Sequence, residues 1–257
     1  MEIAVIGSGI SGLSASLFLS KNNDVTLYEK NNYLGGHTNT KTINYRDKKI
    51  NVDTGFIVFN KLNYPNLLKL FDFYNVAYED SDMSLSVSNV HNNIEWSGQN
   101  INTIFADRYR LLDIKFLRFL LNILKFNRFI KKNINELSKD KQPLGDWLKN
   151  KNFSEEFKEN YILPMSAAIW SMSSNDVLNY PISNLFSFFN NHRLLHEKKL
   201  RPQWLTVSNG SKSYIDKILN STNINTRLNS KIDKIDTNNG KFLLTDINGV
   251  EKEYDRI

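Results

Sequence analysis

The sequence predicts an α/β fold that opens with a parallel βαβ unit and is interrupted by a long, mainly helical insertion. An apolar run, Glu2–Ile6, leads directly into a glycine-rich turn, Gly7–Gly12, and a second apolar run follows at Val25–Glu29. The stretch 107–141 places Phe, Leu, Lys and Arg at helical spacing, whereas 204–257 returns to short alternating segments. Strand patterns at both ends and helical patterns between them predict an α/β domain with a helical domain inserted into it.

The opening turn has the spacing of a dinucleotide-binding motif, Gly-x-Gly-x-x-Gly. Gly7 permits the tight turn out of the strand, Gly9 leaves room for a pyrophosphate beside the backbone, and Gly12 permits close packing of helix on strand. Free N–H groups at the start of the following helix favour bound phosphates. The predicted cofactor-binding residues of this turn are Gly7, Ser8, Gly9, Ile10, Ser11 and Gly12.

The second strand ends in an acid, Glu29, which stands seventeen positions after Gly12. A carboxylate at this place is positioned to accept a hydrogen bond from an adenosine ribose hydroxyl, and it disfavours a 2′-phosphate. Lys30, the next residue, is included in the predicted cofactor site. Strand, glycine turn, helix, second strand and terminal acid occur in this order, and together they predict a Rossmann-like unit.

A second glycine pair lies shortly after Glu29, in Leu34–Thr38, and an Asp-x-Gly turn follows in Val52–Phe56. A unit that binds NAD alone does not need this second pair. The arrangement resembles the flavoprotein superfamily of amine oxidases, phytoene desaturases and protoporphyrinogen oxidases. The resemblance implies a Rossmann-like FAD-binding domain of the GR2 type, with FAD as the cofactor.

The same resemblance implies the remaining cofactor contacts. In those proteins the glycine pair lies near the pyrophosphate and flavin, the Asp-x-Gly turn lies near the isoalloxazine, and a strand late in the chain contacts the adenine through its backbone. His37 stands where many of them carry Arg. The residues assigned in this way are Gly35, Gly36, His37, Thr38, Thr54, Gly55, Phe56 and Ile232.

Four longer segments narrow the resemblance to one bacterial group. They are Gly35–Asn39, Val52–Asn60, Asn63–Leu67 and Pro164–Ser171. The group consists of NAD/FAD-binding, amine-oxidase-like proteins related to the phytoene-desaturase branch. Their genes often neighbour those of cyclopropane-fatty-acid-synthase-type methyltransferases, which implies chemistry on fatty-acyl chains.

The chain is expected to divide into three segments. Residues 1–58 form the first part of the FAD-binding domain, 59–203 form a mainly helical substrate or cap domain, and 204–257 form the second part of the FAD-binding domain and end in a β-meander. Flavoproteins of this class are considerably longer and close with a late glycine-containing turn. The chain is therefore expected to be the amino-terminal portion of such a protein, without its carboxy-terminal part.

Local patterns predict the elements within these segments. Pro65 suits the first turn of a helix that ends at Phe73. The alternation in Ser84–Ser88, followed by Asn92-Asn93, predicts a hairpin. The other predicted elements are helices over 107–141, 145–161 and 213–219 and strands over 224–228, 231–235, 241–245 and 252–257.

The stretch 107–141 is unusual in its charge. It has ten basic and four acidic residues, a surplus equal to the net charge of the whole chain, +6. Such a basic helix rich in Phe and Leu is a candidate for contact with an anionic membrane surface. A core-packed helix with a solvated basic face explains the same pattern equally well. Nucleic acid is not expected as a partner, because no recognition module is visible.

Composition excludes several kinds of site. The chain has no cysteine, which rules out disulfides, thiolate metal sites and cysteine nucleophiles. His192 and His196 are helix-spaced but lack the Glu of a zinc-protease motif, so no metal site is predicted. No apolar run reaches the roughly 18 residues of a spanning helix, and the early first strand leaves no room for a signal peptide. The expected location is the cytoplasm, with peripheral contact at the inner membrane face.

These observations predict an FAD-dependent oxidoreductase that acts on a hydrophobic substrate, either fatty-acyl or lipid-linked. No catalytic residue is nominated, because the isoalloxazine itself accepts the hydride and the protein supplies orientation and exclusion of water. Pro164–Trp170 is expected to form part of the substrate cavity wall, with core packing of Met165, Ile169 and Trp170 as the alternative. Phe186, Phe188 and Phe189 are expected to deepen the same aromatic region, as a cavity for a lipid requires. The alternative functions are a truncated, non-catalytic relative that binds lipid or a partner, and an FAD-dependent isomerase.

Overall fold

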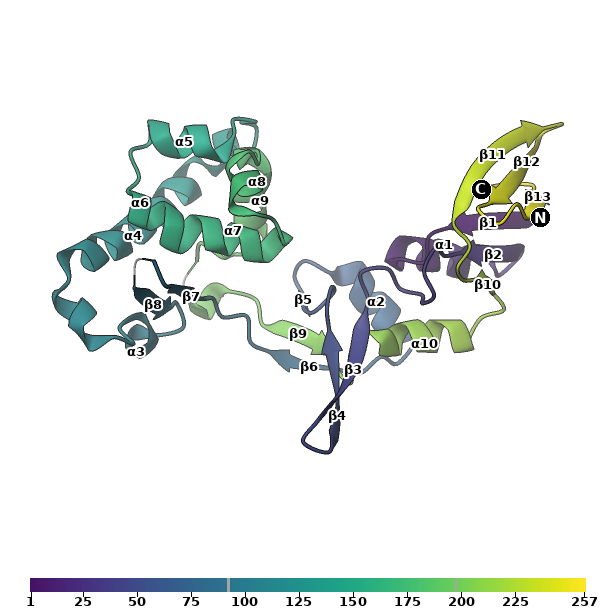
Figure 1. Cartoon of the computed structure of the whole chain (residues 1–257), viewed down its shortest axis with the longest axis horizontal. Coiled ribbons are helices and arrows are strands. Elements are labelled where there is room, and N and C mark those ends of the chain that lie inside the picture. Colours follow the sequence, from purple (N-terminus) through teal and green to yellow (C-terminus); the bar gives the residue numbers. More distant parts are fainter. Residues whose placement is uncertain (92, 197) are drawn as a thin grey trace. The chain divides into compact units, whose positions relative to one another are not determined.

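The computed structural model describes residues 1–91, 93–196 and 198–257. The chain forms two compact units (Figure 1). The α/β unit consists of Met1–Ser81 and Gln203–Ile257, and the helical unit consists of Asp82–Pro202. The sequence predicts that residues 1–58 and 204–257 bind the cofactor and that 59–203 bind the substrate. This assignment of roles stays a prediction.

A parallel sheet carries the opening motif of the α/β unit. Its strands lie in the order β1 (Glu2–Ile6), β2 (Asp24–Tyr28) and β10 (Asn225–Arg227), with Ile6 opposite Tyr28. Helix α1 (Ile10–Leu19) connects β1 to β2, so the predicted βαβ unit is confirmed. On the other side of β1 the Ala4 N–H donates to the Arg256 carbonyl at 3.0 Å, which adds the end of the chain to this layer.

A β-meander follows β10, as the sequence predicts. It consists of β11 (Ile232–Asn238), β12 (Lys241–Asp246) and β13 (Glu251–Tyr254) in antiparallel register. Its inner face meets the parallel sheet through a small core in which the Tyr28 and Tyr254 hydroxyls hydrogen-bond at 2.7 Å. This pair joins positions that are 226 residues apart in the sequence.

Two further sheets and two helices complete the α/β unit. A hairpin pairs β3 (Thr40–Tyr45) with β4 (Lys48–Asp53), and a three-stranded sheet has the order β5 (Phe59–Asn60), β9 (Trp204–Val207) and β6 (Tyr78–Ser81). The helices are α2 (Pro65–Phe73), which begins at Pro65 as predicted, and α10 (Lys212–Asn220). The core of this unit gathers Leu13, Leu27, Phe59, Phe71, Leu205, Tyr214 and Ile218.

The helical unit opens with a hairpin of β7 (Ser86–Asn89) and β8 (Ile94–Ser97), close to where the sequence predicts one. Asn92 of the predicted turn lies outside the described residues. The α-helices that follow are α3 (Ile101–Ile104), α4 (Ile114–Leu137), α5 (Leu144–Asn150), α6 (Glu155–Phe157), α7 (Leu163–Trp170), α8 (Ser174–Leu178) and α9 (Ile182–Asn191). Shorter helical turns cover Arg108–Leu112, Lys158–Ile162, which is a π-helix, and Lys198–Leu200.

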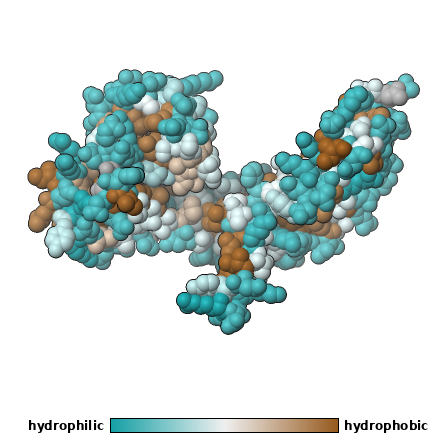
Figure 2. Space-filling model, in the orientation of Figure 1, coloured by the Kyte–Doolittle hydropathy of each residue, from teal (hydrophilic) through white to brown (hydrophobic). Residues whose placement is uncertain are grey.

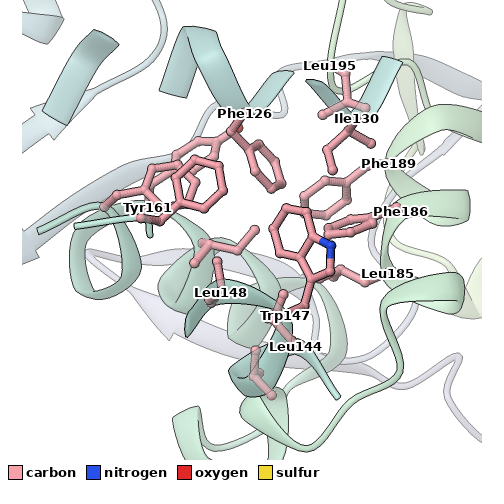
Figure 3. Close-up of a cluster of buried hydrophobic side chains, with 14 of the residues drawn as sticks. Phe126, Ile130, Leu144, Trp147, Leu148, Tyr161, Leu185, Phe186, Phe189 and Leu195 are labelled. Carbon is pink, nitrogen blue, oxygen red and sulfur yellow. The ribbon is translucent and has the colours of Figure 1, made fainter. Parts of the chain in front are cut away.

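Helix α4 is the longest element of the unit, and one of its faces builds the core. Phe116, Phe119, Phe126 and Ile130 on that face are at most 1% exposed. Figure 3 shows Phe126 among the rings of Trp147, Tyr161 and Phe186. The core-packed alternative is therefore right for this face of the basic stretch.

The segment expected to line a substrate cavity packs against the same core. Met165, Ile169 and Trp170 of α7 are partly buried against it, and Phe186 and Phe189 of α9 are fully buried. The structure therefore places Phe186 and Phe189 in the hydrophobic core of the helical unit. Among the described residues, no helix combines the length and apolarity needed to cross a membrane.

Candidate cofactor site

In the turn between β1 and α1, two positions require glycine for reasons of backbone conformation and packing. Gly7 has φ +96°, in the left-handed region, and its N–H donates to the Tyr28 carbonyl at 2.8 Å. A Cβ on Gly12 would lie 1.8 Å from the Gly7 carbonyl oxygen, so no side chain fits there. These two positions therefore have the roles predicted for them, a tight turn and a close approach of helix to strand.

Gly9 is different, because neither conformation nor packing requires a glycine at this position. Its φ of −63° is open to any residue, and a Cβ built on it would meet nothing within 4 Å. It is also the N-cap of α1 and provides no side-chain cap. The first N–H groups of a helix have no partner within it, so the open space beside Gly9 adjoins donors suited to an anion.

Glu29 lies at the end of β2, buried at 5% exposure. Its Oε2 accepts from the Ser8 N–H at 3.0 Å and from Ser8 Oγ at 2.5 Å, and its Oε1 accepts from the Asn31 N–H at 2.9 Å. Burial raises the pKa of Glu29, but these hydrogen bonds outweigh it and hold the pKa below its ordinary value. Because each carboxylate oxygen accepts more than one bond, the ionised group can still receive a ribose hydroxyl.

The second glycine pair lies directly against the first motif. The Gly35 N–H lies 3.1 Å from both the carbonyl and the Oγ of Ser8. A Cβ on Gly36 would stand 3.1 Å from the Gly9 Cα, and Gly36 itself has φ +61°. The structure thus brings together two motifs that are separated by more than twenty positions in the sequence, around the open space at Gly9.

The Asp-x-Gly turn is joined to this loop through the backbone. The Phe56 N–H donates to the His37 carbonyl at 2.8 Å, and a Cβ on Gly55 would lie 2.2 Å from that same oxygen. The His37 and Thr54 side chains are exposed, and Thr54 Oγ1 donates to the Asn39 carbonyl at 2.8 Å. The predicted residues from Gly35 to Phe56 therefore form one connected loop system with the opening turn.

Ile232 reaches this region by another route. The Ser230 N–H donates to the Glu29 carbonyl at 2.8 Å, which places the start of β11 next to the end of β2. Ile232 is partly buried against the core that includes Tyr28. Lys30 is exposed beside the acid, and its N–H is one of the donors that lower the pKa of Glu29. That all these residues contact a cofactor stays a prediction.

Sequence reasoning missed one polar cluster that holds this loop system in place. Asp53 accepts from the Ser211 N–H with both carboxylate oxygens, at 3.0 and 2.9 Å, and from Ser211 Oγ at 2.7 Å. Thr40 Oγ1 also donates to Asp53 and accepts from the Lys212 N–H at 2.9 Å. The acid of the Asp-x-Gly turn thus ties β4 to the start of α10.

Thr38 is the second contact of this kind. Its hydroxyl hydrogen-bonds the buried Tyr214 hydroxyl of α10 at 2.5 Å.

Among the described residues no cluster of His, Asp or Glu could hold a metal ion, and His192 stacks on Phe188 with ring centres 3.9 Å apart. At the glycine loops, the structure thus places backbone N–H groups and the buried carboxylate of Glu29.

Comparison with known proteins agrees with this geometry. Residues 5–74 match the family model described as an NAD(P)-binding Rossmann-like domain. No curated protein matches the chain in sequence. Solved structures do match, among them an oxidoreductase from Methanosarcina mazei at 18% identity and a TM-score of 0.59, and a putrescine oxidase variant redesigned in cofactor binding at 15% identity and 0.64.

The fold of this chain is therefore similar to the corresponding part of these two oxidoreductases. A conjugated-linoleic-acid-producing fatty acid isomerase from P. acnes also matches, at 14% identity and a TM-score of 0.55, over 98% of this chain. The two oxidoreductase matches cover 99% of this chain. This chain spans only 56–57% of the length of these three structures. The family model over residues 5–74 indicates a dinucleotide-binding domain of the Rossmann type.

Proposed function

We propose that this chain binds FAD and belongs to an oxidoreductase that removes hydride from a hydrophobic substrate. The observation that carries the proposal is the open space at Gly9, bounded by the α1 N-terminus and Gly36 and continuous with the loop to Phe56. The fold does not require a glycine at position 9, but a ligand that lies against the backbone there would require one. The buried, ionised Glu29 suits an adenosine ribose and disfavours a 2′-phosphate.

Each group would have one task. The α1 N–H groups and the Gly35–Gly36 backbone would hold the diphosphate, and Glu29 would hold the ribose. Bound FAD would supply the hydride acceptor. The turn Thr54–Phe56 would orient the ring, and Ile57, which follows it and is 53% exposed, would offer an apolar side chain beside it. An apolar contact there suits a substrate of hydrocarbon character.

A second candidate function is an FAD-dependent isomerase on fatty-acyl chains. The fatty acid isomerase among the structural neighbours supports it, as does the acyl-chain chemistry that the sequence resemblance implies. The two functions differ in net electron flow. An oxidoreductase leaves reduced flavin after anaerobic mixing with substrate, whereas an isomerase returns the flavin to the oxidised form in every turnover.

FAD binding is tested by titrating the chain into FAD and following flavin fluorescence, with NAD⁺ as the competing ligand. The unaltered chain should bind FAD in preference to NAD⁺. Gly9→Val should weaken FAD binding at least about tenfold, or about 1.4 kcal/mol, by filling the open space. Gly98→Ala is the matched control, because a Cβ there meets its nearest neighbour at an ordinary 3.6 Å. Equal affinity in both variants would remove the main support for the proposal.

A further inference from the structure

Helix α4 has an exposed apolar face opposite the one that builds the core. Ile114, Leu117, Leu121 and Leu124 are 79, 36, 64 and 61% exposed. They are separated by three, four and three positions, so they lie along one side of the helix. We call them the exposed row. The turn that precedes α4 adds Tyr109 and Leu112, both 89% exposed, and Figure 2 shows hydrophobic side chains gathered at this edge of the helical unit.

The same side of α4 continues into a basic groove. Arg128 follows Leu124 by four positions, and Lys131 and Lys132 come one turn later, so the row changes from apolar to cationic without leaving its face. The groove is an open depression with a volume of about 660 Å³. Its lining residues are Leu124, Asn127, Arg128, Lys131, Lys132, Leu195, His196 and Arg201. Leu124 belongs to both the row and the groove.

The cations of the groove have no carboxylate partner in the described part of the chain. None of the ion pairs there includes Arg128, Lys131 or Lys132, and Arg201 donates its Nε to the His196 carbonyl at 2.9 Å. Burial lowers the pKa of the His196 imidazole, and the charges of Lys131, Arg193 and Arg201 lower it further. The positive charges of α4 and of the segment after α9 therefore converge on one place.

Two polar atoms in the groove are buried without a hydrogen-bond partner. They are Asn127 Oδ1 and His196 Nδ1. Buried polar atoms are nearly always paired, so an unpaired one calls for an explanation. An imidazole N–H donates to an anionic oxygen, and the Asn127 amide can turn its NH₂ group toward the same ligand. A phosphate group in the groove would accept from such donors and neutralise the convergent charge.

We propose that the exposed row and the basic groove together form a docking surface for a bilayer of anionic phospholipid. One headgroup phosphate lies in the groove, and the row enters the boundary between headgroups and acyl chains. Charge complementarity selects this occupant over a second copy of the chain. Neither the row nor the lining of the groove includes an acidic residue, so pairing two copies along both would bury the cations of the groove without partners.

Co-flotation of the full chain with vesicles tests the proposal. Vesicles of phosphatidylcholine with about a third phosphatidylglycerol should carry the protein upward, and vesicles of phosphatidylcholine alone should not. The double variant Arg128→Gln/Lys131→Gln should bind roughly 30-fold more weakly, the effect of two cations near an anionic surface. Its matched control, Lys139→Gln/Lys149→Gln, removes the same charge from exposed positions outside the row and groove and should bind like the unaltered chain. If both double variants weakened vesicle binding equally, the attraction would come from net charge alone, and the proposed docking surface would be wrong.

The apolar half is tested separately. Leu121→Gln/Leu124→Gln should reduce binding to the anionic vesicles by at least about tenfold, and Ile247→Gln/Val250→Gln, exposed in the α/β unit, should not. If the row variant kept full binding, or if light scattering showed a dimer that only this variant abolished, the bilayer would be the wrong occupant.

A third arm separates a headgroup from free phosphate. Inorganic phosphate, compared with sodium chloride at equal ionic strength, should displace the protein from vesicles no better than the salt does. Specific displacement by phosphate would make the groove a site for a soluble ligand and overturn the proposal. Flavin binding by the variants is measured in parallel, because the docking surface does not depend on the cofactor.

Discussion

The α/β unit and the helical unit use their residues in different ways. In the α/β unit the backbone conformation determines which amino acid fits: Gly7 has a positive φ, and there is no room for a side chain at Gly12. In the helical unit the position on a face decides, since Phe126 and Leu121 of the same helix are 0 and 64% exposed. The roles of the glycines in a backbone motif can therefore be predicted one residue at a time. The role of a helix that is both basic and apolar can be assigned only when the structure shows which face is buried.

The largest effect should come from the core of the helical unit. Phe126 contacts the rings of Trp147, Phe153, Phe157, Tyr161 and Phe186. Phe126→Ala should lower the free energy of unfolding by about 3–5 kcal/mol, because it leaves a cavity among those rings. Urea titration followed by tryptophan fluorescence measures it. Phe73→Ala, at a side chain that is 74% exposed, should change stability by no more than about 0.5 kcal/mol.

The next effect belongs to the opening turn. Gly12→Ala should destabilise the protein by about 3 kcal/mol, because its Cβ would collide with the backbone of Gly7. Gly9→Ala should cost no more than about 1 kcal/mol, the effect of alanine at a helix N-cap, since open space surrounds that position. Thermal unfolding of the two variants without ligand distinguishes a packing glycine from a binding one. A similar loss in both would contradict the distinction.

A smaller loss is expected at the acid that ties β4 to α10. Asp53→Ala removes the acceptor for Ser211 and Thr40, so stability should fall by about 2 kcal/mol, the usual effect of losing hydrogen bonds to a charged group. Asp216→Ala, at an exposed position on α10, is the matched control. If both variants unfolded at the same urea concentration, Asp53 would not hold the loop in place.

The contribution of Glu29 should depend on pH. Its pKa is lower in the folded chain than in the unfolded one, so its stabilisation is fully present above the unfolded pKa of about 4.3 and is lost as pH falls through the folded pKa. Glu29→Gln should therefore be less stable than the unaltered chain at pH 6, and the difference should narrow toward pH 3. If the difference in free energy of unfolding between the two proteins stayed constant across this pH range, the effect would not come from ionisation of the Glu29 carboxylate. Glu253→Gln, exposed on β13, gives the baseline.

The smallest effect on stability should come from the exposed row. Leu121→Gln should shift the free energy of unfolding by no more than about 0.5 kcal/mol, because the side chain is 64% exposed in the folded chain. The same urea titration as for Phe126 measures it. A loss above about 2 kcal/mol would show that Leu121 is part of the core, and the contrast between the two faces of α4 would fail.

Much of the α/β unit follows from the sequence, because its signals are local. The glycine turn, the strand after it and the helix beginning at Pro65 are encoded by neighbouring residues, and the structure has all three. The β3–β4 hairpin was missed. Its turn uses Arg46 and Asp47 at φ +46° and +61°, where the usual sequence signal is Asn-Gly.

Other features were beyond local patterns. The role of Asp53 depends on Ser211, which is 158 positions away, so no spacing rule reveals it. The convergence of His196 and Arg201 with Lys131 likewise arises only when the segment after α9 folds back along α4. For the basic stretch, charge and composition left a core helix and a surface helix open, and the structure has a face of each kind on α4.

The hydroxyl pair of Tyr28 and Tyr254 has a consequence for the order of folding. The helical unit is continuous in sequence, Asp82–Pro202, whereas the α/β unit is split around it. A ribosome therefore releases every residue of the helical unit before β10 and the meander exist. Contacts between distant positions also form slowly, because closing the intervening chain costs entropy. We expect the helical unit to fold first during synthesis and the α/β unit to fold after it.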